Sequence, residues 1–103
     1  MSDINIRKIR FSMLEETELE IKNFDALALA LGEHCLKKLL KGNPLFREIY
    51  GYFLRSNKPI ILVEYGGENI LGMTKLLKRY LEKMANKVYS NILFIYDFTE
   101  KDC

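Results

Sequence analysis

The sequence contains no tryptophan and no glutamine, and it has one histidine and two cysteines. His34 and Cys35 are adjacent and Cys103 ends the chain, which is not a recognisable zinc-binding spacing. Neighbouring residues on a helix point about 100° apart, so His34 and Cys35 cannot readily bind one ion together. We expect His34 on a helix face near the edge of the core, Cys35 as a small buried residue, and no disulfide framework.

Long hydrophobic runs are also absent. No apolar stretch approaches the roughly 18 residues that a membrane-spanning helix requires. Residues 1–10 lack the apolar centre of a signal peptide, so we expect a soluble, cytoplasmic chain without a membrane span. Hydrophobic residues make up 49% of the sequence and charged residues 29%, which excludes the disordered and fibrous classes. A length of 103 residues predicts a single domain, residues 1–103.

The absence of glutamine, together with many charged residues, is typical of a thermophile. The seven asparagines count against this interpretation, and compositional drift in a short chain explains the pattern equally well. The net charge of +2 does not indicate nucleic-acid binding. One predicted helix face does gather basic side chains, namely Lys75, Lys78, Arg79, Lys83 and Lys87. Because no exposed aromatic residues for stacking are evident beside them, we interpret this face as solvated, with RNA binding as the alternative.

No catalytic motif is present in the sequence. The four serines form no G-x-S-x-G element, and none stands at a known spacing from His34. Gly66 and Gly67 follow a predicted strand, but Glu68 interrupts any glycine-rich phosphate loop and would repel a phosphate. We therefore predict that Gly66 and Gly67 form a structural turn. We expect no catalytic, cofactor-binding or metal-binding residues in this chain.

The first part of the chain carries mixed signals. In residues 4–13 the apolar positions shift between the two faces of a strand, whereas Ile6, Ile9 and Met13 fit one face of a helix. We therefore favour a helix there, with a strand as the alternative. Residues 17–22 alternate acidic and apolar side chains, which indicates a strand with one solvated face.

Two helices are predicted in the middle of the chain. Asn23 is the expected N-cap of a helix over residues 24–41, and Asp25 lies near its positive end. Pro44 suits the first turn of the next helix, which extends over residues 44–55. Glycine commonly ends a helix, so Gly42 is expected to end the first helix before the second begins.

The predicted helix over residues 44–55 is unusually apolar. Its apolar side chains cover an arc of about 200°, whereas a surface helix needs an arc of about 100°. The helix therefore either lies deep in the core or covers a partner. For the second case we predict an interface, in a homodimer or with a missing domain, that consists of Phe46, Ile49, Tyr50, Tyr52 and Phe53.

Residues 59–65 are almost continuously apolar and predict a central strand that is buried on both faces. Residues 69–86 form an amphipathic helix, and residues 91–97 form the last strand. Glu64 and Asp97 would form a carboxylate pair only if these two strands are parallel. The elements together predict an α+β fold, a ferredoxin-like variant with a small, mainly antiparallel sheet and helices on one face. The expected core consists of Leu19, Ile21, Leu27, Leu31, Leu36, Phe53, Ile61, Val63, Leu77, Leu81, Leu93 and Ile95.

Residues 14–100 resemble a known family in two segments. The first segment carries Leu19-Glu20, Asp25, Ala26-Leu27 and Glu33-His34, and the second runs Ile61-Leu62-Val63-Glu64-Tyr65-Gly66-Gly67. This order is similar to the C-terminal cap, or substrate, domain of FAD-linked oxidases such as D-lactate dehydrogenases and glycolate oxidase subunits. In that family the aspartate precedes a helix reading Ala-Leu-x-Leu, and the second segment is a strand that ends at a glycine.

The resemblance implies a portion of an FAD-dependent 2-hydroxy-acid oxidoreductase, a flavoprotein. The matched residues are then structural, because the family's flavin-binding domain and substrate-binding residues have no counterpart in these 103 residues. On this hypothesis the isolated chain neither binds FAD nor has activity, and its partner is the missing flavin-binding domain. The alternative hypothesis is a standalone α+β interaction module or homodimer.

Overall fold

The computed structural model describes residues 4–63, 70–83 and 89–97. These residues form four strands, three α-helices and two short 3-10 helices. In chain order they are β1 (Asn5–Arg10), η1 (Phe11–Glu16), η2 (Ile21–Asn23), β2 (Ala26–Ala30), α1 (Glu33–Gly42), α2 (Pro44–Arg55), β3 (Ile60–Leu62), α3 (Ile70–Lys83) and β4 (Asn91–Tyr96). None of the helices in these ranges is long and apolar enough to span a membrane.

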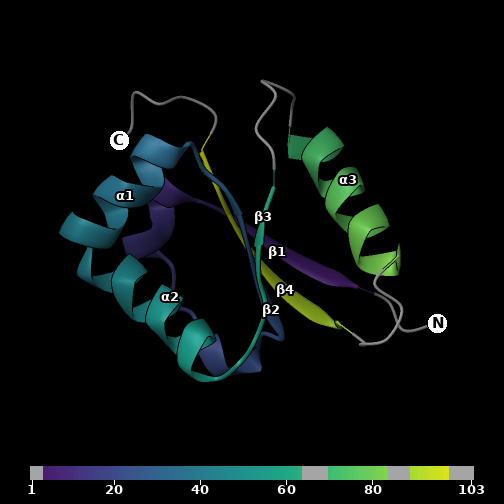
Figure 1. Cartoon of the computed structure of the whole chain (residues 1–103), viewed down its shortest axis with the longest axis horizontal. Helices are drawn as coiled ribbons and strands as arrows, with labels where there is room; N and C mark the ends of the chain where they lie inside the picture. Colours follow the sequence, from purple (N-terminus) through teal and green to yellow (C-terminus); the bar gives the residue numbers. More distant parts are fainter. Residues whose placement is uncertain (1–3, 64–69, 84–88, 98–103) are drawn as a thin grey trace.

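The four strands form one sheet in the order β1-β4-β2-β3, and every pair of neighbours is parallel. The sheet lies between α1 and α2 on one side and α3 on the other (Figure 1). The chain thus combines helices with a single sheet, as predicted, but the prediction of an antiparallel, ferredoxin-like sheet with helices on one face is wrong. Parallel neighbours need a crossover connection, and such connections place helices on the faces of the sheet.

Strand β2 shows how the two faces of the sheet differ. Its residues alternate leucine and alanine and are all at most 1% exposed. Leu27 and Leu29 pack in one core cluster with residues of α1 and α2, such as Leu39 and Phe53. The alanines pack in a second cluster with Met73, Leu77 and Leu81 of α3. Each face of the sheet therefore has its own core.

Several predicted elements of the first part of the chain are wrong. Residues 26–30 form a strand and not the start of a helix, although alanine and leucine are strong helix formers. Residues 5–10 also form a strand, and its apolar positions shift between faces because Ile9 packs in one core cluster and Ile6 packs against the other. No strand forms over residues 17–22, where coil leads into η2. In β2, burial on both faces of the sheet outweighs local propensity.

The prediction of a central strand over residues 59–65 is also wrong. Strand β3 lies at one edge of the sheet, and its three residues are only partly buried or exposed. Pro59 directly precedes it, a position typical of proline beside an edge strand. By contrast, α2 and β4 occupy the predicted positions, and so does α3 as far as it is described.

The predicted core divides into two groups. Six residues are at most 3% exposed, namely Leu27, Phe53, Leu77, Leu81, Leu93 and Ile95. The others are partly buried and pack against one of the two clusters, namely Leu19, Ile21, Leu31, Leu36, Ile61 and Val63. Most members of this second group lie outside the strands and helices, or on the edge strand β3.

Candidate interaction surface at strand β3

The carboxyl ends of the strands are the first place to look for a site, because ligands of parallel sheets bind there. Asp97 follows β4 and is 4% exposed, and its N–H donates a hydrogen bond to the carbonyl of Ala30 (3.1 Å). Glu33 stands in the first turn of α1 and pairs with Lys37 at 3.1 Å. A carboxylate at this position opposes the binding of an anion at the helix N-terminus. The described residues at this edge, Asp97 and Glu33, therefore offer little to a phosphate ligand.

The strand-end residues of the second resemblance segment cannot be placed. Glu64, Gly66 and Gly67 lie outside the described residues, so the predicted carboxylate pair and the predicted turn are not located. Within residues 4–63, 70–83 and 89–97, no group of three or more His, Cys, Asp or Glu side chains could hold a metal ion. His34 is exposed on α1. Cys35 is 1% exposed and buried as predicted. Its sulfur is in a disulfide, so the prediction from the cysteine spacing that disulfide bonding is absent is wrong.

The apolar arc of α2 is filled mainly by the chain's own core. Phe46, Ile49 and Phe53 are each 0% exposed and belong to the core cluster beneath α1 and α2. Tyr50 and Tyr52 are partly buried and pack against the same cluster. Three of the five residues of the predicted interface are thus inside the domain and can contact no partner in this fold. For these three residues, burial in the chain's own core, the other explanation of the wide apolar arc, is the one that the structure shows.

Among the described residues, no strand pairs with the outer side of β3, and β3 pairs with β2 only. Leu27 N–H donates to the carbonyl of Pro59 (3.0 Å), and Val63 N–H donates to the carbonyl of Leu29 (2.8 Å). Alternate residues of a strand bond to the same side, so the backbone N–H and C=O groups of Ile60 and Leu62 face away from the sheet. These are the groups that a further strand would use.

Two grooves flank this edge, one on each face of the sheet. The groove toward α3 has a volume of about 420 Å³ and is lined by Pro59, Ile60, Ile61, Leu62, Val63, Leu76, Leu77 and Tyr80. The groove toward α2 has a volume of about 430 Å³ and is lined by Tyr50, Leu54, Asn57, Lys58, Ile60 and Leu62. We call β3 and these two grooves the β3 edge surface. Leu62, Leu54, Leu76 and Tyr80 are each more than half exposed on it.

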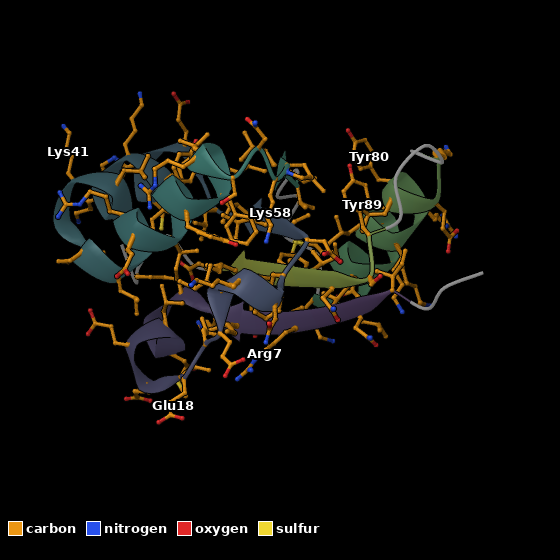
Figure 2. The ribbon with its side chains drawn as sticks, turned by 90° about the horizontal axis from the view of Figure 1, so that it is seen from below. Arg7, Glu18, Lys41, Lys58, Tyr80 and Tyr89 are labelled. Carbon is orange, nitrogen blue, oxygen red and sulfur yellow. The ribbon has the colours of Figure 1, made fainter. Side chains whose placement is uncertain are left out.

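The one lysine of the β3 edge surface is turned into the domain. Lys58 Nζ donates hydrogen bonds to the carbonyls of Phe24 (2.9 Å) and Lys22 (3.3 Å) and to the hydroxyl of Tyr52 (2.8 Å). The ammonium also lies 4.9 Å from the centre of the Tyr52 ring, a cation–π distance. Figure 2 shows Lys58 in the middle of the molecule, whereas Lys41 extends outward at one end. The hydrogen bond from Lys58 stabilises the tyrosinate and lowers the pKa of Tyr52 below 10.0.

Part of the charge of α3 lies away from this surface. At about 100° per residue, Lys75, Lys78 and Glu82 lie on the flank opposite Leu76 and Tyr80. Arg79 and Lys83 lie on the same side of the helix as Leu76 and Tyr80. Of these residues, only Leu76 and Tyr80 line the groove beside β3. The labelled Tyr80 is at the surface of α3 in Figure 2. The described residues that line the groove toward α3 carry no charge.

Sequence reasoning identified the apolar run over residues 59–65 but not its position at an edge. The signal that points to an edge is Pro59, which has no N–H to donate to a neighbouring strand. The exposure of Leu62 depends on the order of the strands, which the sequence pattern does not contain. The inward orientation of Lys58 depends on contacts with residues more than thirty positions away.

Comparison of the chain with protein-family models, with curated proteins and with solved structures finds no match. The resemblance to the FAD-linked oxidase C-terminal domain therefore stays a hypothesis from the sequence. Function has to be argued from the surface itself.

Proposed function

We propose that this chain is a protein-interaction module that binds an extended, apolar segment by pairing it with strand β3. The observation that carries the proposal is the outward-facing backbone of Ile60 and Leu62 between two grooves, of which the one toward α3 is mainly apolar and the one toward α2 also contains Asn57 and Lys58. Strand addition of this kind obtains affinity from main-chain hydrogen bonds and specificity from pockets for alternate side chains.

The two grooves suit the side chains of an added strand. Successive residues of a strand point to opposite faces of the sheet, so a bound segment would direct its side chains alternately toward α2 and α3. Leu54 lines one groove, and Leu76 and Tyr80 line the other. The preferred segment is therefore apolar on the face toward α3, whereas the groove toward α2 also accepts a polar side chain beside Asn57.

The oxidase resemblance supports a different function, and we rank it second. It implies that Ala26 and Leu27 begin a helix, whereas these residues form the central strand β2. None of the described contacts at the β3 edge surface favours it. A flavin absorbance band at stoichiometric level in the purified chain would support it.

A labelled peptide tests the proposal. We suggest a fluorescent peptide of the β3 sequence, residues 58–63, with lysines added at each end for solubility, and fluorescence anisotropy with the dilute chain as titrant. We expect Leu62→Lys to weaken binding about tenfold or more, because an apolar contact worth roughly 1.5–3 kcal/mol is replaced by a charge. Leu71→Lys is the matched control, since Leu71 is similarly exposed on α3 but lines neither groove.

A second peptide separates strand pairing from hydrophobic contact. Proline at alternate positions removes the N–H donors that pairing requires while keeping the peptide apolar. We expect this peptide not to bind. Equal binding of both peptides, or equal effects of Leu62→Lys and Leu71→Lys, would contradict the proposed function.

A further inference from the structure

We infer that the segment bound at the β3 edge surface is strand β3 of a second copy, so that the sheet continues through a twofold symmetric dimer. This inference rests on the proposed function and names its partner. It differs from a dimer through the aromatic residues of α2, because Phe46, Ile49 and Phe53 are inside the domain.

The direction of the backbone groups selects one arrangement centred on β3. A twofold axis perpendicular to the sheet brings two copies of one edge together as antiparallel strands. Residues that face outward then exchange both backbone hydrogen bonds with their opposite residues. With Ile60 and Leu62 facing outward, placing the axis at Ile61 sets Ile60 of each copy opposite Leu62 of the other. Both outward-facing residues of this short strand are satisfied in that register.

The same register places like surfaces together. On the α2 side, Leu62 meets Ile60 of the other copy, with Leu54 beside them. On the α3 side, Ile61 meets its own copy at the axis, with Leu76 and Tyr80 above it. Non-hydrogen-bonded pairs such as this one bring their side chains closest together. The exposed apolar side chains at the edge are thereby covered by their own equivalents.

The lack of charge along residues 59–63 allows a second copy to bind at this edge. Each group in a twofold interface lies near its own equivalent, so a charged edge would repel itself. Charged residues make up 29% of the sequence, yet residues 59–63 contain none. Lys58, the nearest cation, is held inward by Phe24 and Tyr52. Sheet proteins that stay monomeric commonly place lysine or another charge on such an edge.

Sedimentation velocity across a micromolar concentration series tests the inference. The samples are the full chain, Leu62→Lys and the control Leu71→Lys, and circular dichroism melting shows whether each variant is folded. We expect the wild type and Leu71→Lys to form dimers, and Leu62→Lys to dimerise at least about tenfold more weakly. Because Leu62 is 67% exposed, its replacement should leave the fold intact.

The possible outcomes separate the inference from the proposed function. A monomer at every concentration would overturn the inference, and so would a dimer that Leu62→Lys leaves unchanged. Growth into larger species would also overturn it, because the twofold contact closes at two copies. If the chain is monomeric but still binds the β3 peptide through Leu62, only the inference fails. If the peptide does not bind and any dimer is insensitive to Leu62→Lys, both fail.

Discussion

Asp25 and Asn91 are joined by two hydrogen bonds that run in opposite directions. Asp25 N–H donates to the carbonyl of Asn91 (2.8 Å), and Asn91 N–H donates to the Asp25 carboxylate (3.0 Å). The same carboxylate oxygen accepts a bond from Ser90 N–H (2.9 Å). Asp25 therefore fixes the start of β4 against the start of β2, residues that are far apart in the sequence. The prediction that Asp25 lies near the positive end of a helix is wrong, because Asp25 precedes strand β2.

Replacement of Asp25 should destabilise the fold. Asp25→Ala leaves two partly buried N–H groups without their acceptor, and we expect the free energy of unfolding to fall by about 1–3 kcal/mol. Asp25→Asn keeps an acceptor oxygen, so its free energy of unfolding should fall clearly less. Urea unfolding followed by circular dichroism measures both. A loss for Asp25→Ala no larger than that for Asp25→Asn would show that the carboxylate does not hold the two strands together.

Ionisation of Tyr52 should make stability depend on pH just below 10.0. Its pKa is lowered in the folded chain, chiefly by the hydrogen bond from Lys58. The folded chain therefore loses this proton before the unfolded chain does. Between the lowered pKa and 10.0 the unfolded state binds more protons, so stability gains a favourable contribution as the pH rises. That contribution is absent at lower pH, where both states are protonated.

Tyr52→Phe and Lys58→Met provide the comparison for this prediction. We expect the stability difference between wild type and Tyr52→Phe to grow with pH in this window, because other groups titrate equally in both. The absorbance of tyrosinate should also appear at lower pH in the wild type than in Lys58→Met, which lacks the hydrogen-bond donor. Identical tyrosinate titrations in wild type and Lys58→Met would show that Lys58 does not lower this pKa.

A larger side chain in place of a small one on β2 should destabilise the fold. Ala28 is 0% exposed and faces the core cluster beneath α3. Ala28→Leu adds volume to a packed interior, and we expect the free energy of unfolding to fall by about 1–3 kcal/mol. Leu is a good helix former, so the same change in a half-exposed helix would have little effect. An unchanged melting temperature would mean that residues 26–30 are not the central strand.

Local sequence signals predicted the elements that depend on local chemistry. Asn43 and Pro44 predict the start of α2, and in the structure the side chain of Asn43 accepts a hydrogen bond from Phe46 N–H (3.0 Å). The apolar pattern of residues 91–96 likewise identifies β4. These signals lie within a few residues of the feature they predict.

The missed features depend on contacts between distant segments. Ala26 to Ala30 have helical propensity, and only burial between two helical layers makes them a strand. The parallel direction and the strand order follow from long crossovers that periodicity does not report. The candidate site has the same origin, because an apolar run such as residues 60–62 lies at the centre or at the edge of a sheet according to that order.

Amide hydrogen exchange at β3, measured by NMR at low and high concentration, tests the central claim most directly. Val63 N–H bonds to Leu29 and should be protected at both concentrations. We predict that the amides of Ile60 and Leu62 exchange fast in the dilute chain and become protected at high concentration or with the β3 peptide. Protection of both amides in the dilute chain, or fast exchange under every condition, would contradict an outer edge of β3 that pairs with a further strand.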